Sequence, residues 1–197
     1  LSPAHPIANN LFALGAYKKG DFKEGTDRLE KLGDLLDDYP PNLYLLALGK
    51  YRLNEMAQAE SLFEKYLATT PENPRARVIL AELMSRRQNH QRAVDLLRPL
   101  VDRDNPSPEA AMALAGAYLA LGNAVAAKDA YDKAASATDD PTARLRIGMG
   151  RLQIGESDKA LGDIESVLER DNKSIPGRTA LALTFLRRGQ FAKALEA

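Results

Sequence analysis

The sequence predicts an all-α solenoid in which one helical hairpin repeats along the chain. A small residue recurs at intervals of 34, 34, 34, 33 and 34 positions, at Gly25, Ala59, Ala93, Ala127, Ala160 and Ala194. A second small residue stands 12 positions before each of these, at Ala13, Ala47, Ala81, Ala115, Gly148 and Ala182. Two small columns with constant spacing indicate two helices in each repeat that approach closely where only Ala or Gly fits.

Proline and turn residues divide the chain into these repeats. The boundaries between repeats carry Pro6, Pro40, Pro74, Pro108, Pro141 and Pro176, and proline starts a helix readily but breaks one internally. A turn between the two helices is expected at Gly20, Asn54, Gln88, Gly122, Gly155 and Gly189. The expected repeats are 6–39, 40–73, 74–107, 108–140, 141–174 and a partial repeat 175–197. Each has a first helix of about 13 residues and a second of similar length.

Apolar spacing inside the repeats is helical. In the second repeat Ala59, Leu62, Phe63 and Tyr66 fall on one helix face, and no stretch of the chain alternates with a period of two, so no β-structure is expected. Residues 1–197 are expected to form a single array. Because the chain opens with Leu1 and stops at Ala197 within a helical pattern, we expect it to be a segment of a longer protein.

Composition argues against several kinds of site. The 27 basic and 27 acidic residues cancel, which gives no general attraction to nucleic acid or anionic membrane, and without cysteine there is no disulfide or thiolate site. Neither histidine, His5 nor His90, stands at a spacing that would pair it with a nucleophile. The acidic pairs at 37–38 and 139–140 precede proline and predict helix capping. We therefore expect no enzyme, no cofactor and no metal site.

The repeats resemble the tetratricopeptide repeat (TPR) family. The fourth repeat carries the family pattern in Leu114, Ala115, Tyr118, Gly122, Asn123, Ala127, Tyr131 and Ala134. The chain departs from it at Gly25, where Ala is usual, and at Gln88, where the turn Gly is usual. The resemblance covers nearly the whole chain. It implies a right-handed superhelix of about five and a half hairpins whose first helices line the concave face.

A narrower resemblance concerns bacterial TPR lipoproteins of exopolysaccharide export and PEP-CTERM sorting systems. It depends on Arg98-Pro99-Leu100 at the end of one repeat, on the Leu- and Ala-rich repeats and on the turn Leu121-Gly122-Asn123. This resemblance implies a periplasmic or envelope-associated scaffold.

The first helices then predict a partner-binding surface. Tyrosines of the first two repeats form an aromatic wall, basic residues recur one repeat apart at Lys18, Arg52 and Arg86, and the groove becomes apolar toward the C-terminus. Aromatic and Arg side chains dominate the binding energy of protein interfaces. The predicted concave residues are Tyr17, Lys18, Tyr44, Leu48, Tyr51, Arg52, Arg75, Glu82, Arg86, Met112, Leu119, Met149 and Leu152.

Three functions are compatible with this sequence. The first is a non-catalytic scaffold that binds a peptide or protein segment, with an acidic group near apolar anchors, in its concave groove. The second is an assembly module whose groove fills with its own neighbouring repeats or a second copy, with the uncapped, apolar C-terminal end, including Leu183 and Leu186, as the interface. The tyrosines of the aromatic wall can also simply pack between adjacent first helices. The third is a regulatory part of an enzyme whose catalytic domain lies outside these residues.

Overall fold

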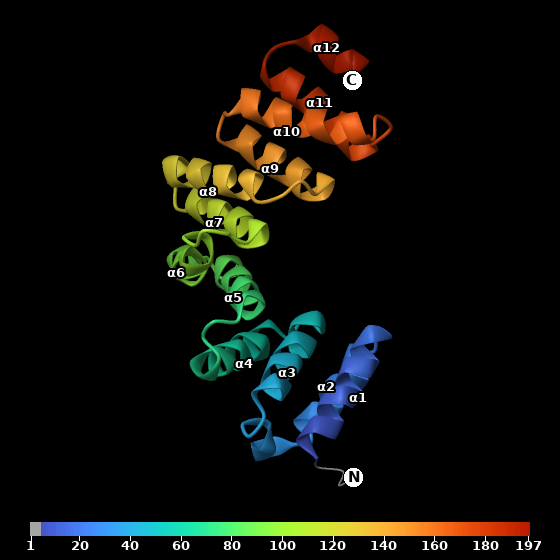
Figure 1. Ribbon diagram of the computed structural model, residues 1–197, viewed down its shortest axis with the longest axis vertical. Helices are drawn as coiled ribbons and strands as arrows, with labels where there is room; N and C mark the ends of the chain where they lie inside the picture. Colours follow the sequence, from blue (N-terminus) through green and yellow to red (C-terminus); the bar gives the residue numbers. More distant parts are fainter. Residues whose placement is uncertain (1–4) are drawn as a thin grey trace. The chain divides into compact units, whose positions relative to one another are not determined.

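The computed structural model describes residues 5–197, and within this range the chain is entirely helical and loop, with no strand. Figure 1 shows successive helical hairpins. Residues 1–4 lie outside the described range. The first helices of the hairpins are α1 (Pro6–Lys18), α3 (Pro40–Arg52), α5 (Pro74–Arg86), α7 (Pro108–Ala120), α9 (Pro141–Gln153) and α11 (Ile175–Arg187). The second helices are α2 (Phe22–Glu30), α4 (Met56–Thr69), α6 (His90–Val101), α8 (Ala124–Ser136), α10 (Ser157–Arg170) and α12 (Phe191–Glu196). The prediction of an all-α fold of helical hairpins is confirmed.

The turn inside each hairpin has left-handed backbone geometry at every predicted position. The φ angles are 84° at Gly20, 65° at Asn54, 64° at Gln88, 74° at Gly122, 80° at Gly155 and 69° at Gly189. Positive φ costs a glycine nothing but is unfavourable for a residue with a Cβ. Gln88 therefore holds a strained conformation because the hairpin requires it.

The first hairpin differs from the expectation of two similar helices. Its second helix, α2, ends at Glu30 after nine residues and is followed by a short 3-10 helix, η1 (Gly33–Leu36). Gly33 has a φ of 53°, which an α-helix cannot accommodate, so the helical pattern is interrupted there. The predicted capping is correct at Asp140, whose carboxylate accepts from the Ala143 N–H at 2.8 Å. It is wrong at Asp37, which forms an ion pair with Lys65 instead.

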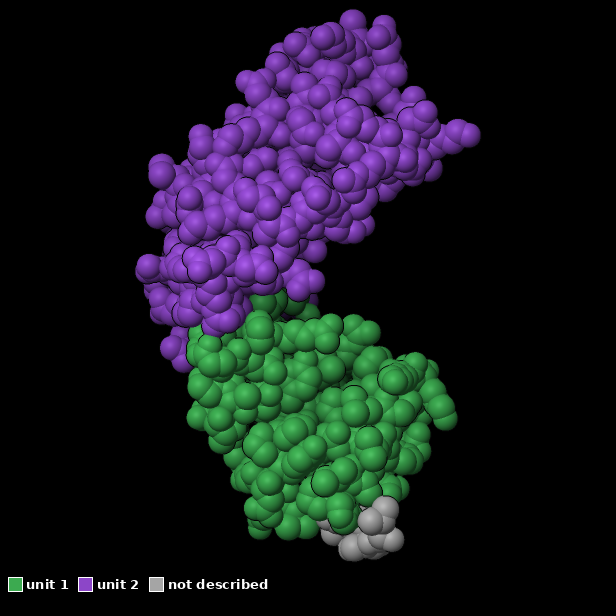
Figure 2. Space-filling view, in the orientation of Figure 1, with its two compact units in different colours: residues 1–83 green, residues 84–197 purple. Residues whose placement is uncertain are grey.

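The chain forms two compact units, residues 1–83 and 84–197, and each is described by itself (Figure 2). In the first unit Ala13, Leu29, Leu32, Leu45 and Leu46 form a buried cluster. The second unit is built around fully buried side chains that include Leu97, Ile147 and Ile164. The members of the two small columns from position 13 to position 160 are buried, which explains the close packing of the helices in each hairpin.

Each unit also buries a cation at the same place in its hairpin. Lys50 of α3 lies 2.5 Å from Glu30 and 2.7 Å from Glu55. Burial alone would lower the pKa of Lys50, but the two carboxylates outweigh this effect and raise it. Arg151 of α9, 101 positions later in the chain, lies 2.5 Å from Asp132. The fourth and sixth repeats have an aromatic residue at this position, so an ion pair here replaces an aromatic packing contact.

Candidate partner-binding site

A cavity of about 450 Å³ lies in the first unit, between α1, α3 and the start of α5. It brings together a set of apolar, aromatic and basic side chains. These are Leu14, Tyr17, Lys18, Phe22, Tyr44, Leu45, Leu48, Tyr51, Arg52, Arg75 and Ile79. The predicted concave residues of the first two repeats, together with Arg75, therefore line one cavity. Glu82, also in this unit, is not part of the lining but contacts it through Tyr51.

Tyr17 forms a rigid part of the wall. Its hydroxyl donates to the Leu45 carbonyl at 3.1 Å, so the hydroxyl of Thr26, 2.9 Å away, donates to Tyr17. Gly49 makes room for this arrangement, because a Cβ there would collide with Thr26 and with the Tyr17 hydroxyl. Burial raises the pKa of Tyr17. With its polar group already satisfied, Tyr17 offers a partner only the exposed part of its ring.

The other two tyrosines are also held by neighbouring side chains. Tyr44 is half-buried and packs against Phe63 and Tyr66, with ring centroids 6.0 and 5.4 Å away. Burial raises the pKa of Tyr44, and the charge of Arg75 partly opposes this increase. The Tyr51 hydroxyl donates to Glu82 at 2.9 Å. These contacts hold both rings in place, which lowers the entropic cost of binding against them.

Three basic side chains surround this aromatic wall. Lys18 and Arg75 are exposed, and the Arg52 guanidinium lies 4.8 Å from the centre of the Phe22 ring. Among residues 5–197, none of the three forms an ion pair. The cavity therefore combines apolar surface with positive charge that no carboxylate of this range neutralises at contact distance. Such a surface is suited to an acidic group next to an apolar anchor.

The remaining predicted residues lie in the second unit, and two of them are corrected. Met112 is 9% exposed and Leu152 is 3% exposed, so both are core residues rather than partner-facing ones. The reason is that first helices pack on one another: α7 contacts α9, and α9 contacts α11. Met149 is 37% exposed, Leu119 is partly buried and Arg86 is exposed at the end of α5.

The comparisons with known proteins agree with this architecture. A family model described as "Anaphase-promoting complex, cyclosome, subunit 3" matches residues 54–134, which is less than half of the chain. A tetratricopeptide repeat protein from Parabacteroides merdae has 16% identity and a TM-score of 0.76, over 96% of this chain and 76% of that one. A thermophilic TPR protein from Thermus thermophilus has 19% identity and a TM-score of 0.65, over 98% and 100% of the two chains. The chain has the tetratricopeptide repeat fold.

A further TPR-like neighbour is PilW, described as a widely conserved type IV pilus biogenesis factor. It has 13% identity and a TM-score of 0.80, over 97% of this chain and 89% of that one. None of the curated proteins compared with the chain is similar enough in sequence to count as a relative. At these identities the likeness to solved structures concerns the TPR fold.

Sequence reasoning missed part of the cavity lining. The sequence pattern places Phe22 only in the turn Gly20-Asp21-Phe22, yet its ring lies 5.2 Å from the ring of Tyr17 and supports Arg52. The sequence could have indicated that Phe22 lines the cavity, because this residue comes directly after a hairpin turn and beside the end of the first helix. Within residues 5–197 no group of three or more potential metal ligands occurs, and no helix of this range is both long and apolar enough to cross a membrane.

Proposed function

We propose that this TPR chain is a non-catalytic scaffold that binds a segment of a partner protein, and that the cavity of the first unit is its recognition site. The partner segment carries an acidic side chain beside an apolar or aromatic anchor. The acidic group lies near Lys18, Arg52 and Arg75, and the anchor packs against Tyr44, Tyr51 and Leu48.

The observation that carries this proposal is the unneutralised positive charge of a preformed aromatic cavity. A surface cation on a folded protein is usually solvated and contributes little. Here the Arg52 guanidinium is held over the Phe22 ring, so it is oriented before a partner arrives. Arg presents paired donors that match a carboxylate, and a pre-oriented Arg loses less entropy on binding.

The proposal is tested by charge reversal at the cavity. The wild-type chain, an Arg52→Glu/Arg75→Glu variant and a Lys31→Glu control would be used to capture partners from a lysate of the source organism. Lys31 is exposed in the same unit and lies outside the cavity lining, so it reports on a charge reversal away from the cavity. The segment responsible in each captured protein would then be mapped and its Kd measured by calorimetry.

We expect an acidic segment that binds the wild-type chain and the control alike and binds the cavity variant at least about tenfold more weakly. Circular dichroism would verify that all three are folded. Equal binding by the cavity variant, or a captured segment without acidic residues, would contradict the proposal.

A second candidate function is an assembly module, and the surface of the last hairpin favours it. The side chains of α11 and α12 include Ile175, Phe191 and Leu195, which are 77, 67 and 91% exposed, together with Leu183 and Leu186. Several large apolar side chains exposed on one hairpin favour an interface. Sedimentation velocity over a concentration series distinguishes the two candidates: self-association that Leu186→Lys and Phe191→Lys abolish would support assembly, whereas a monomer at all concentrations would argue against it.

A further inference from the structure

The exposed face of α1 has nearly the same sequence as the buried face of α3. The segment 11–17 reads LFALGAY and the segment 45–51 reads LLALGKY, so Leu, Ala, Leu, Gly and Tyr recur at matching positions. In α3 this face packs on the first hairpin, and Leu45 is only 5% exposed. In α1 the equivalent residue, Leu11, is 64% exposed. The face of α1 is therefore a hairpin-binding surface that no element within residues 5–197 covers.

A glycine on this face shows what the surface accommodates. Gly49 of α3 is buried, and a Cβ there would collide with the Tyr17 side chain of the preceding hairpin. Gly150 stands at the same position of α9, where a Cβ would collide with the ring of Tyr131 in the preceding hairpin. Gly15 is the equivalent residue of α1, but it is exposed, and a Cβ there would meet no atom within 4 Å. The place that receives a large side chain in two later repeats is therefore open at Gly15.

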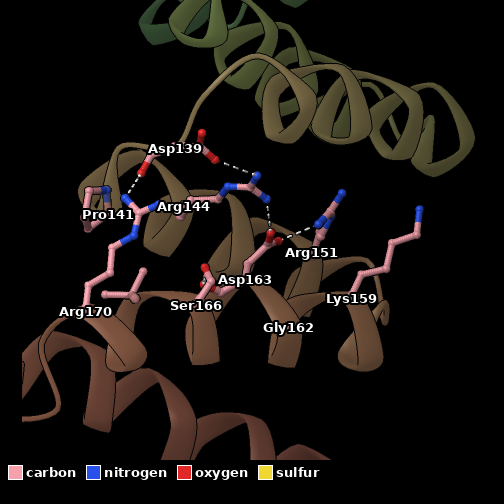
Figure 3. Close-up of a pocket in the computed structure, with 10 residues that line it drawn as sticks. Asp139, Pro141, Arg144, Arg151, Lys159, Gly162, Asp163, Ser166 and Arg170 are labelled. Atoms are coloured by element: carbon pink, nitrogen blue, oxygen red, sulfur yellow. Dashed lines mark hydrogen bonds and ion pairs between the residues drawn. The ribbon is translucent and has the colours of Figure 1, made fainter.

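The α1 face also lacks the buried charge that other hairpins must neutralise. Arg151 lies on the corresponding face of α9 and forms ion pairs with Asp132 of the preceding hairpin and with Asp163 of its own. Figure 3 shows the Arg151 side chain turned toward Asp163. In α3 the same position holds Lys50, which is likewise paired, but in α1 it holds Ala16. An occupant of the α1 face therefore needs no acidic side chain at this place and has to bury apolar surface instead.

The last hairpin of the chain offers an apolar version of what α3 receives. Tyr17 and Thr26 are the side chains of the first hairpin that meet the glycine of α3. In the repeat pattern Leu186 of α11 stands at the position of Tyr17, and Leu195 of α12 stands at the position of Thr26. Both leucines are exposed. A copy that packs its last hairpin on α1 therefore brings two leucines to Gly15, and neither has a polar group that would need a partner there.

We propose that the α1 face, defined by Ile7, Leu11 and Gly15, binds the α11–α12 hairpin of a second copy of this chain. The proposed interface rests on the second candidate function, the assembly module, and gives it a receiving surface. Exposed apolar side chains on both faces supply the driving force. The interface is heterologous, because each copy contributes a different face, so every complex keeps one α1 face free unless a ring closes.

The test blocks the two faces separately. Leu11→Lys closes the α1 face and Leu186→Lys/Leu195→Lys closes the last hairpin, whereas Gln58→Lys adds a charge to the exposed surface of α4 and serves as the control. Gly15→Gln blocks the α1 face by a second route, because its side chain enters open space in a single copy but would collide with a docked hairpin. The full chain and each variant would be followed by sedimentation velocity over a concentration series, alone and in mixtures. Circular dichroism would verify that all are folded.

We expect the wild-type chain and the Gln58→Lys control to form oligomers that grow with concentration, and Gly15→Gln to weaken this association at least about tenfold. The Leu11→Lys variant and the variant of the last hairpin should each stay monomeric alone. Mixed in equal amounts they should form a one-to-one complex, because one keeps the last hairpin and the other keeps the α1 face.

A wild-type monomer at all concentrations, or a mixture that stays monomeric, would overturn the proposal. Self-association of Leu11→Lys alone would also overturn it, because two last hairpins would then pair with each other and the assembly module would survive without the α1 face. The cavity variant Arg52→Glu/Arg75→Glu should associate as the wild type does. Failure of partner binding in the first cavity and failure of this interface are therefore distinguishable.

Discussion

The buried carboxylate of Asp163 allows a quantitative test of how the second unit is held together. Its side chain is 3% exposed and accepts hydrogen bonds from Arg144 at 3.0 Å and from Arg151 at 2.5 Å. The substitution Asp163→Leu removes the acceptor of both guanidiniums. Breaking a buried ion pair on one side costs about 3–5 kcal/mol. Arg144 is one-quarter exposed and Arg151 keeps Asp132, so we expect the lower end of this range, about 3 kcal/mol.

The double variant Arg144→Leu/Asp163→Leu should recover most of this loss. It removes the stranded guanidinium and reproduces the residues Leu43 and Leu62 of the α3–α4 hairpin, so its stability should lie within about 1 kcal/mol of wild type. Urea unfolding followed by circular dichroism, with hydrogen exchange at the α10 amides, measures both. If the double variant is less stable than the single one, the reasoning that this ion pair is dispensable for folding is refuted.

Three further outcomes are expected from the first unit, the hairpin turns and the acid range. Gly49→Ala should destabilise the fold by about 1–3 kcal/mol because the added Cβ would collide with neighbouring side chains. Gly15→Ala, whose added Cβ would meet no atom within 4 Å, should stabilise the fold by about 0.5–1 kcal/mol. Thermal unfolding compares the two variants. Gln88→Gly should stabilise the fold by about 1 kcal/mol because glycine adopts the φ of 64° without strain. Asn54→Gly should stabilise it less, because Asn tolerates left-handed backbone geometry better than Gln does. Equal stabilisation by the two substitutions would argue against backbone strain at Gln88. Burial raises the pKa of Asp132, but hydrogen bonds from Lys159 and Arg151 outweigh it and leave the pKa below its ordinary value. The stabilisation by this carboxylate is therefore complete above the unfolded pKa and is lost as the pH falls below about 5 and through the folded pKa. Asp132→Asn should flatten the stability curve in this range, and an unchanged slope would contradict the assignment.

The fold could be predicted from sequence because its signals are local and repeated. Small residues at fixed spacing, proline at the helix starts and a left-handed residue in each turn act within a few positions of one another. The interruption of the second helix at Gly33 was missed because a single glycine within an amphipathic pattern does not reveal its φ angle. The single array over residues 1–197 and the envelope location implied by the lipoprotein resemblance stay predictions.

The candidate site was easiest to predict where the period of a helix places its residues on one face. Tyr44, Tyr51 and Arg52 lie on one face of α3, so the helical period alone places them together. Met112 and Leu152 were assigned wrongly because their burial depends on neighbouring first helices, and the angle between helices is not encoded in the period of one helix. The ion pairs of Arg151 with Asp132 and Asp163 were missed because the three residues come from three different helices, and the period of one helix does not show which charges meet.

The buried cations also restrict the order in which the repeats can stand. Arg151 finds the acid Asp132 on the preceding hairpin, and Lys50 finds Glu30 at the corresponding place. The third repeat has Arg98 at that place. Deleting one whole repeat, residues 108–140, would leave the period intact but set Arg98 beside Arg151, where two guanidiniums repel each other. Recombination between these repeats is therefore not neutral, because a junction that sets two like charges together at this place is destabilised.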